Sequence, residues 1–242
     1  MNRRIIHIPQ TDSTNRYIHD LQTEGEDMAV VVADYQTAGR GQGSNSWESE
    51  PGKNLLMSIR VNPTMVPPRS QFILSEAGAL AVGDALAHYT EGISLKWPND
   101  IYWKDRKISG TLIETSVSGM GLAACTFGIG ININQQSFHS DAPNPVSLWQ
   151  IIGHEVPVEE VMNHVLDALE VQLALIWAGD FRSVSDRYHQ HLYRRQGFHP
   201  YSDVQGAFMA EILRVEDDGH LVLRDTDGHL RQYAFKEVTF II

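Results

Sequence analysis

The chain has 242 residues and a formal net charge of −11, and this length suffices for one full-sized core and a small appended domain. The acidic balance excludes a large nucleic-acid footprint, which needs a clustered basic face. The single cysteine, Cys125, excludes a disulfide framework and a cysteine-based metal cluster. The sequence has neither an N-terminal signal segment nor a run of about 18 apolar residues, so we expect a cytoplasmic protein with no membrane partner.

The N-terminal part predicts a strand, a polar turn and a helix. The strand covers residues 5–8 and the helix covers residues 15–21. Ser13 and Thr14 stand at the junction between them, and two roles stay open for their hydroxyl groups. They cap the helix, as serine and threonine commonly do, or they also face a pocket, because such a junction presents free N–H groups.

A segment rich in glycine follows, and it organises the prediction for the rest of the chain. This glycine loop, residues 34–47 with the sequence DYQTAGRGQGSNSW, lies between apolar segments 28–33 and 54–61, which we predict to be buried strands. Its glycines permit positive φ, so that successive backbone N–H groups can surround an anion. Arg40 adds a fixed charge with forked donors. A flexible hairpin end is the alternative that glycine content alone leaves open.

Residues 95–114 predict three short strands. The order is strand, corner at Pro98, strand, tight turn at residues 104–106, and strand, because proline interrupts a central strand. Strict alternation along the third strand would place Gly110 on one face and Lys107 on the opposite face.

The remaining pattern completes a mixed α/β fold. Residues 123–132 predict a buried strand with two interior glycines, which weaken a strand unless another group must approach closely. From about Gly197 the chain alternates apolar and polar residues with Asp-Gly turns, which predicts a separate β-domain of four or five strands. Apolar residues at helical spacing predict three more helices, over residues 71–88, 158–177 and 184–193.

Several familiar sites are missing from the sequence. There is no GxxxxGK[ST] phosphate loop and no HExxH metal helix, and Gly39-x-Gly41-x-x-Ser44 departs from the dinucleotide fingerprint at its last position. His189-x-His191 would suit a metal only in an extended segment, and here the pattern is helical.

Five blocks of the sequence together resemble biotin–protein ligases, the biotin–[acetyl-CoA carboxylase] ligases. Each block is weak alone, but all five stand in the family's order and at similar separations. The blocks are STN at 13–15, YQTAGRGQ at 35–42 with Trp47, KWPND at 96–100, DRKISG at 105–110 and GIGIN at 128–132.

The resemblance implies an α/β catalytic domain, a mixed sheet with flanking helices, over residues 1–196, and a small SH3-like β-barrel domain over residues 197–242. Twelve residues precede Ser13. They leave no room for the winged-helix domain of the bifunctional ligase-repressors, so we expect a monofunctional enzyme without a nucleic-acid partner. The resemblance leaves a homodimer open.

The implied reaction has two steps. ATP and biotin give biotinyl-5′-AMP, and the biotinyl group then passes to a lysine of the biotin carboxyl carrier protein or domain of acetyl-CoA carboxylase or a related carboxylase. Like charges about 4 Å apart repel by about 4 kcal/mol at an effective dielectric near 20, so the biotin carboxylate and the α-phosphate need a cation between them. Arg40 and Lys107 are the implied catalytic residues, and Mg²⁺ would neutralise further charge.

The remaining site residues follow from the same match. Biotin's neutral ureido ring needs fixed donors and acceptors, and Gly110 and Gly130 are expected to leave a slot for its bicyclic ring. Trp47 is expected to stack on adenine or to help the loop close, and Asp100 to bind Mg²⁺ directly or through water. The implied biotin-binding residues are Ser13, Thr14, Asn15, Gln36, Gly39, Arg40, Gly41, Gln42, Lys107, Gly110 and Gly130. The implied ATP-binding residues are Arg40, Trp47, Lys96, Asn99, Asp100 and Asn132.

The glycine loop departs from the family pattern at two positions. Many members have GRGRxGRxW, whereas this chain carries Gln42 and Asn45 in place of two arginines. Our hypothesis is that the loop is more mobile and retains its adenylate less tightly.

Three other functions stay open. A lipoate or octanoate ligase-transferase shares the fold superfamily, but it lacks the KWPND block and has an apolar ligand that needs no ureido clamp. A biotin- or nucleotide-binding regulator without catalysis, and a DNA-binding repressor, are the alternatives from other functional classes.

Overall fold

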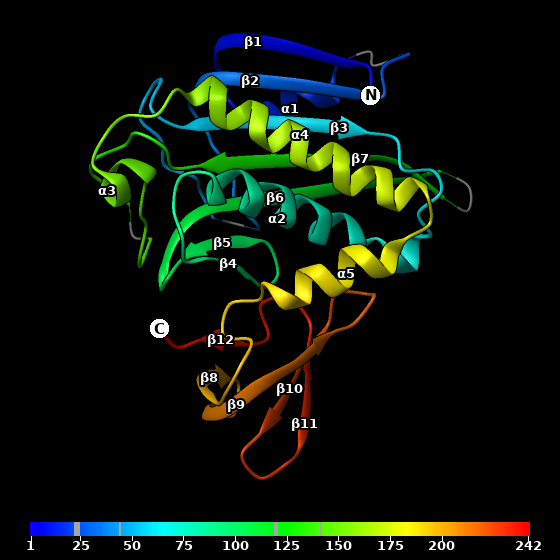
Figure 1. The fold of residues 1–242 in the computed structure, drawn as a ribbon, viewed down its shortest axis with the longest axis vertical. Helices are drawn as coiled ribbons and strands as arrows, with labels where there is room; N and C mark the ends of the chain where they lie inside the picture. Colours follow the sequence, from blue (N-terminus) through cyan, green and yellow to red (C-terminus); the bar gives the residue numbers. More distant parts are fainter. Residues whose placement is uncertain (22–24, 44, 119–120, 141) are drawn as a thin grey trace.

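The computed structural model describes residues 1–21, 25–43, 45–118, 121–140 and 142–242. Ser44, the residue that breaks the dinucleotide fingerprint, lies outside the described residues. The described strands form two sheets (Figure 1), one of seven strands in the order β1-β2-β3-β7-β6-β5-β4 and one of five in the order β11-β10-β9-β8-β12. Among the helices of these ranges, none is long and apolar enough to cross a membrane.

The seven-stranded sheet is mixed, as the sequence predicts. Its first two strands pair in parallel, and all its other neighbours pair antiparallel. The strands are β1 (Arg3–Thr11), β2 (Met28–Gln36), β3 (Leu55–Val61), β4 (Ile93–Lys96), β5 (Asp100–Trp103), β6 (Arg106–Ser118) and β7 (Gly121–Ile131).

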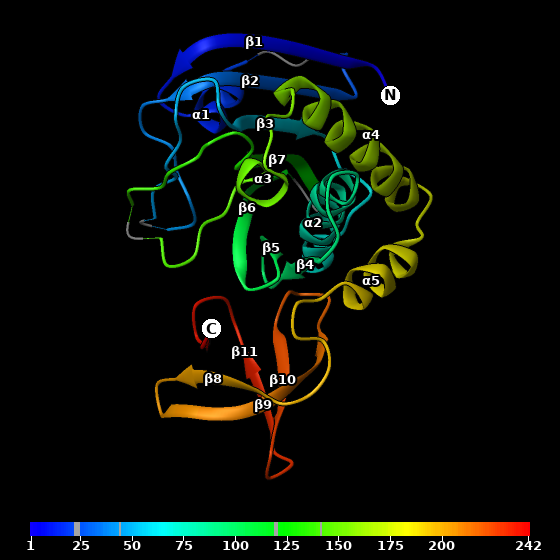
Figure 2. The same cartoon turned by 60° about the vertical axis from the view of Figure 1, so that its left-hand side comes forward.

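Helices cover both faces of this sheet. Figure 2 shows α2 (Phe72–Ala87) and α4 (Val158–Trp177) on one face and α1 (Thr14–His19) on the other. The short α3 (Leu148–Ile152) lies beside the sheet, and α5 (Phe181–Gln190) leads toward the second sheet (Figure 1). The main core fills the space between the sheet, α2 and α4, and a smaller cluster buries Ile18 of α1 against β2.

The second sheet is a small antiparallel β-domain that follows the seven-stranded sheet in the chain, as predicted. Gly219 and Gly228 take positive φ of 91° and 86° in the two Asp-Gly turns that the sequence indicated. Trp97 joins the two parts, because its Nε1 donates to the carbonyl oxygen of Gly219 at 2.9 Å. The strands are β8 (His199–Asp203), β9 (Gly206–Val215), β10 (Leu221–Asp225), β11 (Leu230–Tyr233) and β12 (Thr239–Phe240).

Several elements differ from the prediction, among them β1, α5 and α3. β1 extends beyond residues 5–8, because main-chain pairing with β2 from Arg3 to Thr11 needs no apolar side chains on an edge strand. α5 begins three residues before residue 184, where the Asp180 side chain accepts from the Ser183 N–H at 3.1 Å. α3 was not predicted, although Ser147 and Gln150 form a capping box at its start.

Candidate active site

One large cleft brings together all but one of the predicted site residues. Its volume is about 1220 Å³, and its walls come from the start of α1, the glycine loop, strands β5 to β7 and the C-terminal segment 235–242. Gly39 is the exception, because it does not line the cleft. A Cβ on Gly39 would stand 2.7 Å from the carbonyl oxygen of Trp47, so this glycine is needed to close the loop.

A polar cluster lies along the α1 side of the cleft. Gln36 Oε1 accepts from the backbone N–H of Thr14 at 2.7 Å and from its hydroxyl at 3.1 Å. The Ser58 hydroxyl lies 2.7 Å from Thr14 Oγ1 and 2.5 Å from Asn15 Oδ1. Ser13 is buried and its side chain makes no capping hydrogen bond to α1. Ser13 therefore does not cap the helix through its side chain, and the residue lines the cleft.

One member of this cluster, Ser58, and one residue packed against it, Gly128, were not predicted as site residues. Ser58 stands in the middle of an apolar strand, and its polarity there was the signal that could have drawn attention to it. Gly128 has no room for a side chain, because a Cβ there would collide with Asn15 Oδ1 and stand 2.7 Å from Asn15 Cγ. This packing gives the interior glycine of β7 a physical reason.

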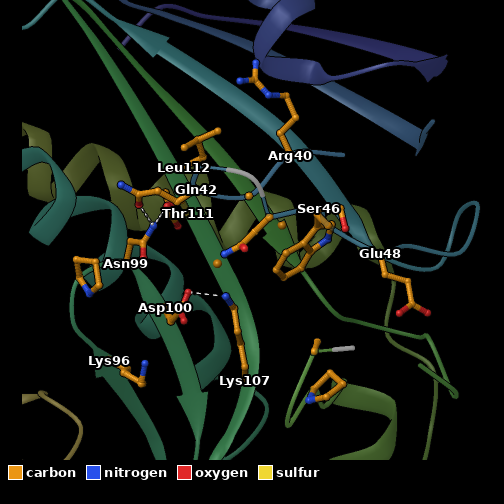
Figure 3. Close-up of a pocket in the computed structure, with 18 of the residues that line it drawn as sticks. Arg40, Gln42, Ser46, Glu48, Lys96, Asn99, Asp100, Lys107, Thr111 and Leu112 are labelled. Carbon is orange, nitrogen blue, oxygen red and sulfur yellow. Dashed lines mark hydrogen bonds and ion pairs between the residues drawn. The ribbon is translucent and has the colours of Figure 1, made fainter. Parts of the chain in front are cut away.

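Lys107 and Asp100 form an ion pair in the cleft, with 2.6 Å between Nζ and Oδ1 (Figure 3). The predicted placement of Lys107 and Gly110 on opposite faces of their strand is wrong. A bulge shifts the register between Ile101 and Tyr102, so that Tyr102 pairs with Lys107 while Asp100 pairs with Gly110. Because the bulge adds one residue to β6, Lys107 turns to the cleft side, where its Nζ lies 3.2 Å from a Cβ built on Gly110.

The indole of Trp47 fills the space beside the two glycines that were expected to leave a slot. A Cβ on Gly130 would stand 2.5 Å from Trp47 Cε2, and one on Gly110 would stand 3.2 Å from Trp47 Cζ3. The indole Nε1 is buried without a hydrogen-bond partner among the described residues. Gly110 and Gly130 therefore leave space for a flat ring, and in this structure the indole of Trp47 occupies that space.

The glycine loop is a closed hairpin. The Gly41 N–H donates to the Asn45 carbonyl oxygen at 2.8 Å, and the Trp47 N–H donates to the Gly39 carbonyl oxygen at 2.9 Å. Arg40 lines the cleft but is exposed, and Figure 3 shows its side chain pointing away from Lys107. The two implied catalytic cations are therefore not side by side in this structure.

The other implied nucleotide residues have partners that fix them. Asn99 Nδ2 lies 2.5 Å from the Thr111 carbonyl oxygen and 3.1 Å from Gln42 Oε1, which connects the turn before β5 to the glycine loop. Asn132 is buried, and its Nδ2 donates to the Val146 carbonyl oxygen at 3.1 Å.

Lys96 lies between the two parts of the chain. Its Nζ is 5.2 Å from the centre of the Tyr102 ring and 4.7 Å from the centre of the Phe240 ring. Burial lowers the pKa of Lys96, while the nearby Asp100 carboxylate opposes that shift. The sequence did not predict the aromatic contribution of Phe240, because it comes from the separate C-terminal sheet.

Comparison with known proteins agrees with this geometry. The model of the biotin/lipoate A/B protein ligase family matches residues 7–132. The biotin–[acetyl-CoA-carboxylase] ligase of Paracoccus denitrificans is 32% identical over 163 residues, which cover 64% of this chain and 67% of that protein. The bifunctional ligase/repressor BirA of Bacillus subtilis is 28% identical, with 97% of this chain and 73% of BirA covered.

A solved structure shares the whole fold. The biotin protein ligase from Aquifex aeolicus in complex with biotin and ATP has a TM-score of 0.80 and 25% sequence identity, and the match covers 97% of each chain.

Proposed function

The chain belongs to the biotin/lipoate A/B protein ligase family, and we propose that its cleft is where a biotin–protein ligase carries out both of its half-reactions. The enzyme forms biotinyl-5′-AMP from biotin and ATP. It then transfers the biotinyl group to a lysine of the biotin carboxyl carrier of acetyl-CoA carboxylase. The free, buried Cys125 is compatible with the reducing cytoplasm as its compartment.

The polar cluster on the α1 side is the single observation that best supports biotin as the substrate. Ser13, Thr14 and Asn15 are buried there beside Gln36. Hydrogen bonds within the cluster hold these polar groups in place as fixed donors and acceptors. A ureido ring offers both N–H donors and a carbonyl acceptor to such groups, whereas a lipoyl or octanoyl chain offers neither. This difference favours biotin over the lipoate alternative.

The adenylation step needs the positive charge in the middle of the cleft. A carboxylate oxygen of biotin attacks the α-phosphorus of ATP, the new C–O–P bond forms, and the bond to the β-phosphate breaks with release of pyrophosphate. Lys107 is the residue proposed to lie between the two anions, and Asp100 holds its ammonium group on the cleft side. Arg40 would have to swing inward to share this role, because its side chain points away from Lys107.

Magnesium fits the site as an ion carried by the phosphates. Mg²⁺ is commonly held by one or two carboxylates together with substrate phosphates, and Asp100 offers such a carboxylate in the cleft. The ion would supply charge neutralisation on the triphosphate.

The transfer step uses the same cleft. The neutral amine of the acceptor lysine attacks the acyl carbon, AMP leaves with the electrons of the acyl–oxygen bond, and the nitrogen gives up one proton to water as the amide forms. Because water hydrolyses this mixed anhydride, the adenylate must be shielded until the acceptor arrives. The glycine loop and Trp47 are proposed to provide that cover.

Exchange of labelled pyrophosphate into ATP tests the proposal. The chain should catalyse exchange that depends on biotin and Mg²⁺, and lipoate should not replace biotin. Exchange supported by lipoate but not by biotin would favour the other branch of the family. A protein that binds biotin tightly and shows no exchange with either acid would be a binding module.

A further inference from the structure

The C-terminal sheet contributes one cation to the cleft. Lys236 stands in the turn between β11 and β12, and it lines the cleft together with the chain end. The C-terminal residues, drawn in red, return to the large sheet below β5 and β6 (Figure 2). Lys236 lies directly over the glycine loop, since a Cβ built on Gly43 would collide with its Nζ and stand 3.5 Å from its Cε.

The backbone conformation at Lys236 indicates that its side chain is held in a specific position. Its φ is +70°, which an L-residue adopts only at a cost, and the residue is not glycine. Phe235 lies beneath the side chain, with 5.8 Å between the ammonium nitrogen and the ring centre. The turn itself is fixed, because the Glu237 carboxylate accepts from the Ala234 N–H at 2.7 Å.

A count of charge in the cleft shows why this cation matters. Four basic residues line the cleft, and a triphosphate brings several negative charges to it. Lys107 is already paired with Asp100. Lys96 is half-buried beside the rings of Tyr102 and Phe240. That leaves Arg40 and Lys236 as the exposed cations, and within the described ranges Lys236 has no carboxylate at ion-pair distance.

The glycine loop is short of positive charge at the same place. It carries neutral side chains at Gln42 and Asn45, on either side of the glycine that Lys236 contacts. Gln42 already has a partner, because its Oε1 accepts from Asn99. A cation from the other sheet would restore charge that the loop does not carry itself.

We propose that Lys236 is a phosphate-binding residue, which the C-terminal domain places over the glycine loop to bind the triphosphate of ATP at its β- and γ-phosphates. This inference rests on the proposed function and assigns the outer phosphates to a residue outside the catalytic sheet. In the adenylation step Lys236 would stabilise the pyrophosphate as the bond to the α-phosphorus breaks. Lys236 would also couple the position of the glycine loop to nucleotide binding, because its ammonium group lies against Gly43 and would contact the phosphates.

Steady-state kinetics and direct binding test the assignment. For Lys236→Gln we expect the KM for ATP in the exchange assay to rise about tenfold, the loss of one charge-assisted contact, while the KM for biotin stays within twofold. Lys236→Arg should keep most of the ATP affinity. Lys236→Gly removes the strain of the positive φ at this position. It should show the same rise in the KM for ATP as Lys236→Gln, with a Tm equal to or higher than that of the wild type.

Lys104 supplies a matched control. It also has a positive φ, 52°, and its ammonium lies 4.5 Å from the centre of the neighbouring Trp103 ring, but it does not line the cleft. Lys104→Gln should leave both KM values unchanged.

Calorimetric titration with inorganic tripolyphosphate separates this inference from the proposed function, since it requires no catalysis. Weaker binding by Lys236→Gln than by the wild type would support the inference even if the chain showed no exchange. Equal tripolyphosphate affinity, with an unchanged KM for ATP, would overturn it. Equal tripolyphosphate affinity with a parallel rise in the KM values for biotin and ATP would also overturn it, because the lysine would then only hold the loop.

Discussion

At the scale of single residues, the cleft depends on close packing at two glycines of β7. The side chain of Asn15 lies against Gly128, and the indole of Trp47 lies against Gly130. The two contacts form different parts of the site, since Asn15 belongs to the polar cluster and Trp47 closes the loop. A single added methyl group is therefore expected to have different effects at the two positions.

Gly130→Ala should reduce biotin binding far more than it reduces stability. The new Cβ would occupy the space where a flat ring packs, 2.5 Å from Trp47 Cε2 in this structure, and Trp47 belongs to the glycine loop and not to the sheet. We expect the KM for biotin to rise by at least a factor of ten, consistent with a clash worth about 1–3 kcal/mol. Titration of the variant with biotin and a thermal melt measure the two effects. A Gly130→Ala variant with wild-type biotin affinity would show that the bicyclic ring of biotin does not pack against Gly130.

Gly128→Ala provides the comparison within the same strand. The new Cβ would collide with the buried Asn15 amide, whose Nδ2 donates a hydrogen bond to Glu114 Oε2 at 2.7 Å. We expect the Tm to fall as well as the biotin affinity, because a buried hydrogen-bonded group must shift.

At the scale of elements, the glycine loop is a hairpin that backbone and side-chain hydrogen bonds close. Hydrogen bonds close it at Gly39 and Gly41, and Asn99 holds Gln42. The sequence hypothesis that this loop retains the adenylate weakly stays a prediction.

Gln42→Arg should slow release of biotinyl-5′-AMP. The substitution adds a forked cation at the family's position and removes the contact from Asn99 Nδ2. We expect the release rate to fall severalfold, as measured by chasing preformed labelled adenylate with unlabelled biotin and ATP. An unchanged release rate would remove the hypothesis. Asn45→Arg is the natural companion variant on the opposite side of Gly43.

Much of the element order was accessible from the sequence, and the reasons are local. α4 has the bounds that its apolar stripe predicted, Val158–Trp177. The corner at Pro98 and the turn before β6 also lie where proline and polar residues indicated. Such signals depend on residues that are close together in the chain, so they can be identified before the fold is known.

The features that the sequence did not reveal depend on distant contacts. The bulge that turns Lys107 to the cleft arises from the register between β5 and β6. Trp47 reaches the glycines only because the loop folds over β7, and Lys236 reaches the loop only because the second sheet docks on the first. Spacing along the chain carries no information about these placements.

At the scale of the whole molecule, a buried carboxyl group lies where the two parts of the chain meet. Glu76 of α2 is buried and receives a hydrogen bond from Ser185 of α5 at 3.3 Å. Burial raises the pKa of Glu76 to about 8, the Ser185 hydroxyl opposes that shift, and Asp217 in the turn after β9 adds to it. Its Oε2 and the hydroxyl of buried Tyr188 have no partners among the described residues.

This carboxyl group should make stability fall as pH rises. The pKa is higher in the folded protein than the ordinary 4.5, so the folded state binds the proton more tightly, and the stabilisation is complete below pH 4.5 and lost as pH rises through about 8. Between these values the wild type should lose about 1.4 kcal/mol of unfolding free energy per pH unit relative to Glu76→Gln. Urea titrations at a series of pH values measure the difference. Parallel profiles for the two proteins would show that the carboxyl group is not desolvated.

Formation of biotinyl-5′-AMP in a single turnover is the measurement that addresses the central claim most directly. Wild-type protein mixed with biotin, Mg²⁺ and ATP should yield one equivalent of the adenylate, detected by mass spectrometry after a rapid quench. Lys107→Ala should bind biotin but form the adenylate at least about a hundredfold more slowly, because two anions must then meet without the cation between them. Adenylate formation by Lys107→Ala at the wild-type rate, or none by the wild type, would contradict the account.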